Sequence, residues 1–226
     1  MRYSNVRTGT FIERPNRFVA YVDIDGVREK CHVKNTGRCA EILTPGSDLI
    51  LEGPFAGRGT RYDVIAAYKN GVLVNIDSQA PNRVALESVN EVLGPVDVVK
   101  PEYTYGNSRI DLFAEQGGRK ILMEVKGVTL ERDGVAMFPD APTERGLKHV
   151  RELASSPEDG FEPCILFLIQ MSGVKCFTPN YETHREFGEA LEEASGAGVR
   201  VLAYDCVVAE DSMTLGKPVD VRLGHS

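Results

Sequence analysis

The chain has 226 residues, 42% of them hydrophobic and 26% charged, which excludes a disordered chain and supplies enough apolar material for one large or two small domains. Its formal net charge of −7 opposes binding of a polyanion over the whole surface, although a local basic patch remains compatible with it. The five cysteines are scattered without zinc-site spacing, the N-terminus has no apolar signal core, and no apolar run is long enough to span a bilayer. These features predict a cytoplasmic protein with reduced thiols.

The first third of the sequence is typical of short strands separated by tight turns. β-branched and aromatic residues gather at 18–24, 27–33, 47–52, 62–68 and 72–76. Asp25-Gly26 and Asn70-Gly71 are strong signals for hairpin turns between them. We therefore predict a small OB-like β-barrel domain over residues 1–80.

From residue 81 onward the pattern changes to alternating helices and strands. Asn82 is expected to cap a helix that ends at Gly94-Pro95, and a hairpin follows at 109–114 and 121–125. Further helices are expected at 143–154 and 183–195, and strands at 164–169 and 199–204. The uninterrupted apolar run 164–169 predicts a central strand covered on both faces. These elements predict an α/β domain over residues 81–226.

The hairpin at 109–125 carries the most informative polar residues. Gly117-Gly118 suits a two-residue turn, which places Asp111 directly opposite Glu124 with Cβ atoms about 5 Å apart. Lys126 lies two residues beyond Glu124 and therefore on the same face. The residues expected on the opposite face are all apolar: Ile110, Leu112, Ile121, Met123 and Val125.

Two facing carboxylates beside an amine suit a hard divalent cation. Mg²⁺ or Mn²⁺ would be held by Asp111 and Glu124, because oxygen ligands are preferred and like charges otherwise repel. Lys126 would then orient or deprotonate the attacking water, or stabilise developing negative charge. The alternative is an amphipathic hairpin with one solvated, charged face, in which two opposed acids would destabilise the sheet.

Asp111 together with Glu124-Val125-Lys126 resembles the PD-(D/E)XK nuclease signature, with Ile110 in place of the proline that precedes the first acid. Further segments spread over nearly the full length form a more specific pattern: Arg14-Pro-Asn-Arg-Phe, His32-Val-Lys-Asn-Thr-Gly-Arg, Pro81-Asn-Arg, Tyr105-Gly-Asn-Ser-Arg-Ile-Asp, Glu124-Val-Lys and Phe138-Pro-Asp-Ala-Pro-Thr-Glu-Arg-Gly-Leu-Lys-His. Through these segments the chain resembles the sugar fermentation stimulation protein A family of bacteria and archaea.

That resemblance implies an N-terminal OB-like domain, a C-terminal PD-(D/E)XK restriction-endonuclease-like domain, DNA binding and a link to sugar-utilisation genes. It also implies Glu87, on the first helix of the second domain, as a third catalytic acid, with Glu102 as its competitor.

Basic and polar residues in both domains are expected to contact nucleic acid. On the barrel they are Arg14, Asn16, Arg17, His32, Lys34 and Arg38, and on the helix at 143–154 they are Arg145, Lys148 and His149. Nearby Phe11, Phe18 and Tyr21 are either stacking platforms for single strands or core residues, and core is the preferred interpretation for Phe18. The helix residues are otherwise an ordinary solvated face.

We therefore predict a DNA-binding protein with a Mg²⁺- or Mn²⁺-dependent endonuclease site. The first alternative is a non-enzymatic DNA-binding regulator of sugar-utilisation genes, and the second is a sensor of a sugar or small phosphate. RNA remains an alternative substrate. The oligomeric state stays open, with a homodimer as one alternative.

Overall fold

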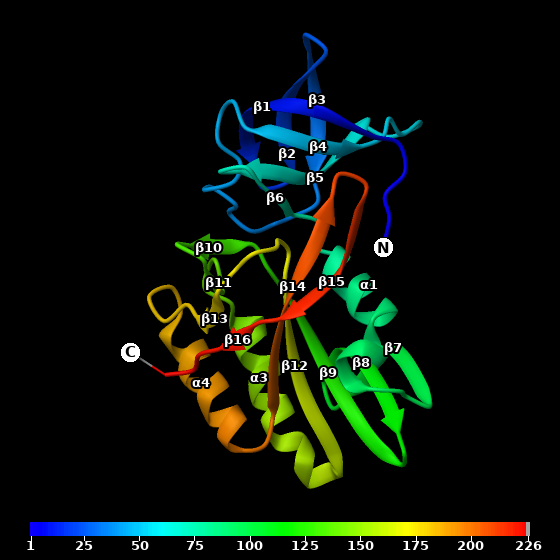
Figure 1. The fold of residues 1–226 in the computed structure, drawn as a ribbon, viewed down its shortest axis with the longest axis vertical. Coiled ribbons are helices and arrows are strands. Elements are labelled where there is room, and N and C mark those ends of the chain that lie inside the picture. Colours follow the sequence, from blue (N-terminus) through cyan, green and yellow to red (C-terminus); the bar gives the residue numbers. More distant parts are fainter. Residues whose placement is uncertain (225–226) are drawn as a thin grey trace.

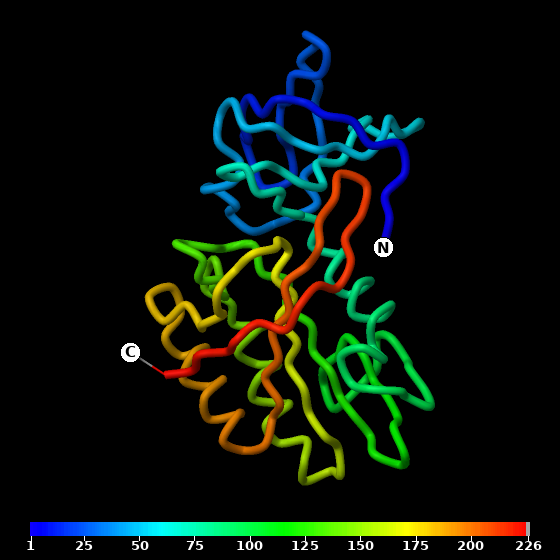
Figure 2. Tube along the Cα trace, in the orientation of Figure 1, coloured from blue at the N-terminus to red at the C-terminus, as the bar shows by residue number. Residues whose placement is uncertain are grey.

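The computed structural model describes residues 1–224, with a β-barrel at one end and a larger α/β domain at the other (Figures 1 and 2). The barrel strands are β1 (Val6–Asn16), β2 (Val19–Ile24), β3 (Val27–Val33), β4 (Asp48–Glu52), β5 (Tyr62–Lys69) and β6 (Val72–Asn75). Strands pair in the order β3-β2-β1-β4-β5-β6, and an additional parallel pairing of β3 with β5 closes the barrel. This closed N-terminal barrel confirms the predicted OB-like architecture.

The longest barrel strand, β1, is the one that the sequence pattern did not predict. Much of its length is partly or fully exposed, so few apolar residues mark it as a strand. Gly9 allows β1 to lie close to its neighbours, since a Cβ there would come within 2.7 Å of the Val22 side chain. Alternation in β2, by contrast, directs Ala20, Val22 and Ile24 into the barrel interior.

The second domain contains two further sheets and four α-helices among the described residues. Its helices are α1 (Ala80–Glu87), α2 (Val89–Leu93), α3 (Glu144–Ser155), the 3₁₀ turn η1 (Ser156–Asp159) and α4 (Arg185–Gly196). The large sheet has the order β15-β14-β12-β9-β8-β7, formed by β15 (Ser212–Pro218), β14 (Arg200–Ala209), β12 (Phe161–Ile169), β9 (Arg119–Val128), β8 (Ser108–Gln116) and β7 (Val98–Tyr105). The small sheet has the order β10-β11-β13-β16, formed by β10 (Leu130–Arg132), β11 (Val135–Phe138), β13 (Cys176–Pro179) and β16 (Asp220–Val221).

Helices cover both faces of the large sheet (Figure 1). On one face, Leu147 of α3 and Phe187 of α4 pack with Phe167 of β12 in one apolar cluster. On the other face, Val84 of α1 packs with Leu166 of the same strand in a second cluster. Residues 164–169 are fully buried, which confirms the prediction of a central strand covered on both sides.

Helix boundaries agree with the sequence pattern at α3 and differ at α1. The helix expected at 143–154 is α3, and Thr143 caps it, since its side chain accepts a 3.0 Å hydrogen bond from the Gly146 amide. Asn82 was expected to cap the first helix, but α1 begins at Ala80 and Asn82 lies inside it. Its side chain is used elsewhere, as described below.

Polar contacts join the two domains and stabilise the segment that leads from one into the other. In that segment, Oδ2 of Asp77 contacts Tyr3 at 3.1 Å and Lys34 at 2.7 Å. Gln170, at the end of β12, donates a 3.0 Å hydrogen bond to Asn75 of β6. The β14–β15 hairpin also extends toward the barrel in Figure 1 and lies beside the N-terminal residues, where Tyr3 N–H bonds Asp211 O at 2.8 Å. Within residues 1–224, no helix is long and apolar enough to cross a bilayer.

Candidate active site

The β8–β9 hairpin places the predicted carboxylates together. Gly117 and Gly118 both adopt positive φ in the turn, and the pairing runs from Gln116 opposite Arg119 to Leu112 opposite Met123. This register is the predicted one as far as Leu112, but the predicted pair of Asp111 and Glu124 is not part of the ladder. Beyond Leu112 the ladder ends, and Asp111 Oδ2 instead accepts a 2.8 Å hydrogen bond from the Val125 backbone amide.

An irregularity on the other side of β8 accompanies this change. The pairing with β7 joins Pro101 to Leu112 and Tyr103 to Ile110, and skips the position of Glu102 and Asp111. Glu102 has a φ of 55°, outside the extended conformation of a strand. The prediction that Ile110 shares a face with Leu112 is therefore wrong: the two side chains pack in different apolar clusters.

Glu124 is buried and is held through only one of its two oxygens. It is 2% exposed, and its Oε1 accepts hydrogen bonds from Lys126 Nζ at 2.5 Å and from His149 Nδ1. Oε2 of the same carboxylate is buried without a hydrogen-bond partner among the described residues. An unpaired carboxylate oxygen away from water is costly, so a bound cation at Oε2 would be stabilising.

The other carboxylate is fixed by its own set of donors. Asn82 of α1 donates a 2.7 Å hydrogen bond to Oδ1 of Asp111, in addition to the Val125 amide at Oδ2. Burial and the nearby charge of Glu124 nevertheless raise the pKa of Asp111. A positive ion between the two carboxylates would offset the effects of burial and of the Glu124 charge on the Asp111 carboxylate.

The pKa of Glu124 moves the other way. Burial alone would raise it, but the hydrogen bond from His149 and the charge and hydrogen bond of Lys126 outweigh burial and lower the pKa of Glu124. Glu124 is therefore stabilised as an ionised carboxylate, whereas the ionised form of its neighbour Asp111 is disfavoured. Hard oxygen donors of this kind fit Mg²⁺ or Mn²⁺.

The third acid expected from the resemblance is not gathered with the pair. Glu87 is 53% exposed at its side chain, and its carboxylate accepts a 2.6 Å hydrogen bond from the Met1 ammonium group. Its competitor Glu102 pairs with Arg109 at 3.1 Å on the surface. In the part of the chain that the structure describes, no three His, Cys, Asp or Glu side chains form a ready metal cluster. Asp111 and Glu124 are the two protein carboxylates of the site.

Four of the expected nucleic-acid residues on the barrel serve the structure of the barrel itself. The Arg14 guanidinium donates to backbone oxygens only, those of Arg17, Asn35, Gly37 and Arg38. Asn16 Oδ1 accepts from the amides of Phe18 and Val19 and so forms a turn. His32 contacts Asp63 at 3.2 Å, and Lys34 pairs with buried Asp77.

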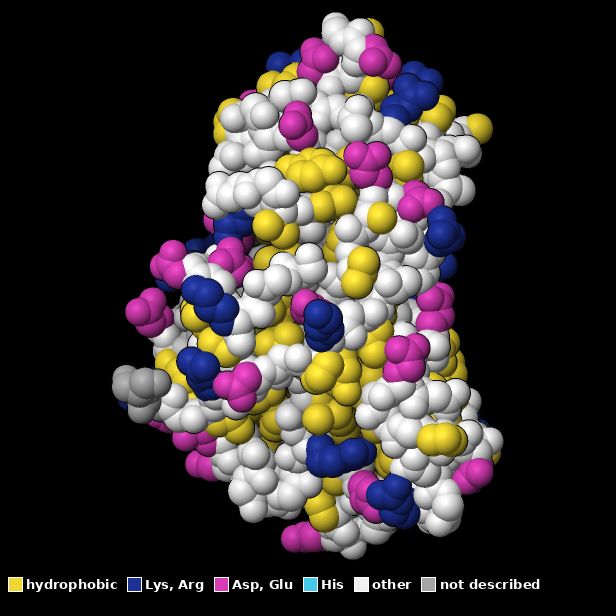
Figure 3. Space-filling view, viewed as in Figure 1, with side chains coloured by type: hydrophobic (Ala, Val, Ile, Leu, Met, Phe, Trp, Pro, Cys, Tyr) yellow, Lys and Arg dark blue, Asp and Glu magenta, His cyan; other side chains and the backbone are white. Residues whose placement is uncertain are grey.

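Arg17 and Arg38 remain available on an open groove. The groove has a volume of about 640 Å³ and is lined by Arg14, Asn16, Arg17, Thr36, Gly37, Arg38, Ala40, Ala141 and Pro142. It therefore runs between barrel loops and the segment before α3. Among the described residues, neither the Arg17 nor the Arg38 side chain forms an ion pair, although the Asp140 carboxylate accepts a hydrogen bond from the Arg38 backbone amide. By contrast, Lys and Arg side chains are interspersed with acidic ones on the face shown in Figure 3.

Two expectations about exposure are wrong. His149 was expected on a solvated helix surface with Arg145 and Lys148, but it is 5% exposed and faces Glu124, because the apolar face of α3 packs on the sheet. Arg145 is exposed as expected, and Lys148 pairs with Glu152 at 3.5 Å. Phe18 was expected in the core, yet it is 52% exposed, because it follows the turn that Asn16 forms at the barrel surface.

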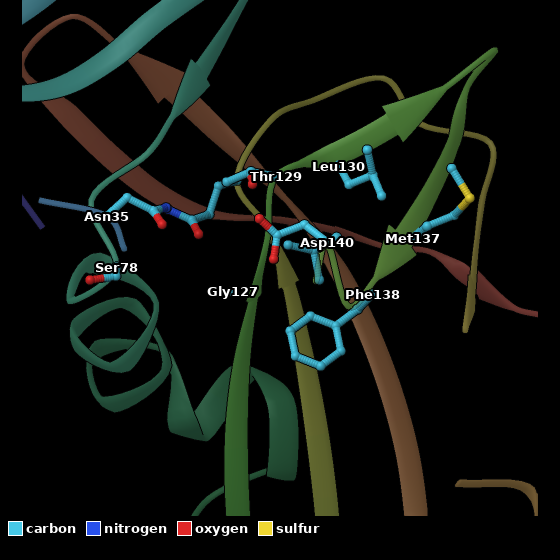
Figure 4. Close-up of a pocket in the computed structure, with 10 residues that line it drawn as sticks. Asn35, Ser78, Gly127, Thr129, Leu130, Met137, Phe138 and Asp140 are labelled. Atoms are coloured by element: carbon cyan, nitrogen blue, oxygen red, sulfur yellow. The ribbon is translucent and has the colours of Figure 1, made fainter. Parts of the chain in front are cut away.

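A small polar cavity lies between the domains, just beyond Lys126 along β9. Its volume is about 120 Å³, and Asn35 reaches it from the barrel while Gly127 and Asp140 reach it from the second domain (Figure 4). The Asp140 carboxylate also accepts a 3.2 Å hydrogen bond from the Arg38 amide. Strand β9, which carries Glu124 and Lys126, thus leads directly to the interdomain boundary.

The sequence did not indicate that Asn82 contacts Asp111 or that His149 contacts Glu124. Asn82 and His149 both come from helices that are distant in sequence from the hairpin. Only their occurrence within the segments Pro81-Asn-Arg and Phe138 to His149 marked them, as part of the family pattern.

Comparison with known proteins places both halves of the chain. Residues 12–76 match the family described as the SfsA N-terminal OB domain, and residues 79–212 match the sugar fermentation stimulation protein RE domain. A sugar fermentation stimulation protein homolog of Desulfitobacterium hafniense is 52% identical over 99% of both chains, and one of Ruminiclostridium cellulolyticum is 49% identical over 99% of this chain and 100% of its own. The solved structure of Pyrococcus furiosus SfsA in complex with Ca²⁺ is similar with a TM-score of 0.86 and 30% identity, covering 98% of each chain. The chain therefore belongs to the sugar fermentation stimulation protein family.

Proposed function

We propose that the chain is a metal-dependent phosphodiesterase that cleaves nucleic acid, with DNA as the expected substrate. The observation that carries this proposal is the buried, unpartnered Oε2 of Glu124 beside Asp111, whose pKa is raised by burial and by that same neighbour. The arrangement of Asp111 before Glu124-Val125-Lys126 also resembles the PD-(D/E)XK nuclease signature. The Ca²⁺ complex of the Pyrococcus furiosus relative supports a hard divalent cation in this family.

Asp111 and Glu124 would hold Mg²⁺ or Mn²⁺ through carboxylate oxygens. The bound cation would neutralise negative charge on the phosphate and lower the pKa of a bound water molecule. Asn82 and the Val125 amide orient Asp111 for this purpose, while His149 and Lys126 hold Glu124. The site is thus built from residues of α1, β8, β9 and α3.

Lys126 brings a positive charge into contact with Glu124. Its ammonium group is largely buried and lies 2.5 Å from Glu124 Oε1. It would stabilise negative charge that develops on the phosphate or orient the attacking water by a hydrogen bond.

The path of the nucleic acid is proposed to follow the groove between barrel and α3. Arg17 and Arg38 would contact phosphates there, since neither side chain forms an ion pair among the described residues. Arg14 would add positive charge while its guanidinium holds the loops in place. Because phosphate contacts position the strand without reading bases, no sequence preference follows from them.

The test is a cleavage assay on supercoiled plasmid DNA, single-stranded DNA and RNA with Mg²⁺ or Mn²⁺. Wild-type protein should cleave at least one of these, and Glu124→Gln should abolish cleavage while the far-UV circular dichroism spectrum stays unchanged. Glu152→Gln is a matched control, because Glu152 also has a buried oxygen without a partner but contacts Lys148 on α3. Metal-independent DNA binding without cleavage would favour the non-enzymatic alternative, and equal cleavage by Glu124→Gln would refute the site.

A further inference from the structure

A histidine from a distant helix contacts the carboxylate that we propose as a metal ligand. Nδ1 of His149, in α3, lies within hydrogen-bond distance of Oε1 of Glu124, in the central strand β9. Both side chains are almost fully buried. An ionised carboxylate can only accept hydrogen bonds, so Nδ1 carries the proton and donates it.

The two oxygens of Glu124 have unequal surroundings. Oε1 accepts from both His149 and Lys126, whereas Oε2 is buried and has no hydrogen-bond partner within residues 1–224. A glutamate side chain has three rotatable bonds, and without a fixed contact it would lose more conformational entropy when it binds a ligand. Anchoring one oxygen therefore prepares the other for a cation.

His149 is better suited than Lys126 to provide that anchor. Lys126 lies on the same strand as Glu124 and reaches it through a long, flexible side chain. His149 belongs to α3, whose residues Leu147 and Val150 pack in the apolar core that also contains Phe167 of the sheet. The ring thus ties the carboxylate to a second, independently packed element.

We infer that His149 is a positioning residue, which fixes Glu124 through Oε1 so that Oε2 remains free for a divalent cation. This inference rests on the proposed function, because it assigns a role within the same site. It deepens that proposal, because it assigns to a helix residue without contact to the cation a direct effect on the affinity for that cation. Residues that hold metal ligands in this way commonly change affinity by about 10- to 100-fold when they are removed.

The experiment is a calorimetric titration of metal-free full-length protein with Mn²⁺. Wild type is compared with His149→Leu, which fills the space but cannot donate, and with His149→Asn, whose amide nitrogen takes a position close to that of Nδ1. We expect a loss of about 10- to 100-fold in Mn²⁺ affinity for His149→Leu and recovery of most of it for His149→Asn. His32→Asn is the matched control, since His32 also contacts a carboxylate, Asp63, but on the barrel.

Two further measurements separate positioning from general stability. Unfolding of the metal-free variants by urea reports the structural role of the ring, and the conservative His149→Asn variant should fold even if His149→Leu does not. In a Glu124→Gln background, His149→Leu should not change any residual Mn²⁺ affinity, because the residue acts through Glu124.

The outcomes distinguish this inference from the proposed function. Unchanged Mn²⁺ affinity in folded His149→Leu, or a loss in His149→Asn as large as in Glu124→Gln, would overturn the positioning role and leave the metal site standing. Equal Mn²⁺ binding by wild type and Glu124→Gln would overturn the metal site itself, and His149 with it.

Discussion

Asn82, inside helix α1, donates a 2.7 Å hydrogen bond to Oδ1 of Asp111 in strand β8. This bond joins the first helix after the barrel to a proposed metal ligand and fixes the direction of the carboxylate. We predict that Asn82→Ala weakens cation binding by about 10-fold, as expected when the hydrogen-bond partner of a metal ligand is lost. The measurement is the Mn²⁺ concentration that gives half of the maximal increase in melting temperature.

The neighbouring residue on α1 provides the control for this prediction. Arg83 is exposed, and Arg83→Ala should leave the Mn²⁺ dependence of the melting temperature as in wild type. An Asn82→Ala protein with unchanged dependence on Mn²⁺ would show that the Asp111 contact has no part in cation binding.

Removal of either groove arginine, Arg17 or Arg38, should make nucleic-acid affinity less dependent on salt concentration. We predict that Arg17→Ala and Arg38→Ala each weaken nucleic-acid binding uniformly across sequences and reduce the slope of log affinity against log salt by about one. Fluorescence anisotropy with a labelled oligonucleotide, titrated at several salt concentrations, measures both effects. Arg28→Ala is the control on the same barrel, because Arg28 is paired with Glu13. Slopes that stay at the wild-type value in both groove variants would rule out phosphate contacts there.

The contact between Lys69 of the barrel and Glu131 of β10 should make interdomain stability depend on pH. Burial alone would raise the pKa of Glu131, but hydrogen bonds from Lys69 and the Gly134 amide outweigh it and lower the pKa. A lowered pKa in the folded state means that the contact stabilises above the ordinary pKa of glutamate, about 4.3, and that this stabilisation is lost as pH falls through the lowered value.

Glu131→Gln should therefore reduce the free energy of unfolding by about 1 to 2 kcal/mol at pH 7 and by less near pH 3. Urea unfolding of both proteins at the two pH values measures this difference. A destabilisation of the same size at both pH values would show that the charge of Glu131 is not its cause.

The cysteines should be unreactive in the folded protein. All five are buried, and burial is the main cause that raises the pKa of Cys31, Cys39, Cys164 and Cys206 to about 12. Since the thiolate is the nucleophile, we predict negligible modification by a thiol-specific reagent at pH 8 and full modification after unfolding. Rapid reaction of any of these four thiols in native protein would contradict the burial described here.

The hairpin at the centre of the site was predictable because residues close together in the sequence determine it. A Gly-Gly turn and alternation in the flanking strands determine the register as far as Leu112, so the sequence alone predicted that Asp111, Glu124 and Lys126 lie at the same end of the hairpin. The barrel was likewise marked by short apolar strands. Strand β1 was not, because polar residues on its outer face dilute the apolar signal.

What could not be predicted depends on contacts between distant segments. Asn82 has the residue type of a helix cap, and only the packing of α1 against the hairpin directs it to Asp111. His149 lies beside exposed Lys148, and only the orientation of α3 shows that it faces the sheet. Glu87 has suitable chemistry for a ligand, but its carboxylate is taken by the Met1 ammonium group.

The metal site formed by Asp111 and Glu124 is tested most directly by a crystal of the full-length protein soaked in MnCl₂ and measured at a wavelength where manganese scatters anomalously. This assignment predicts a strong anomalous peak about 2.0 to 2.3 Å from Glu124 Oε2 and within reach of an Asp111 carboxylate oxygen. A map with no peak between these two side chains, at a Mn²⁺ concentration that supports cleavage, would contradict it.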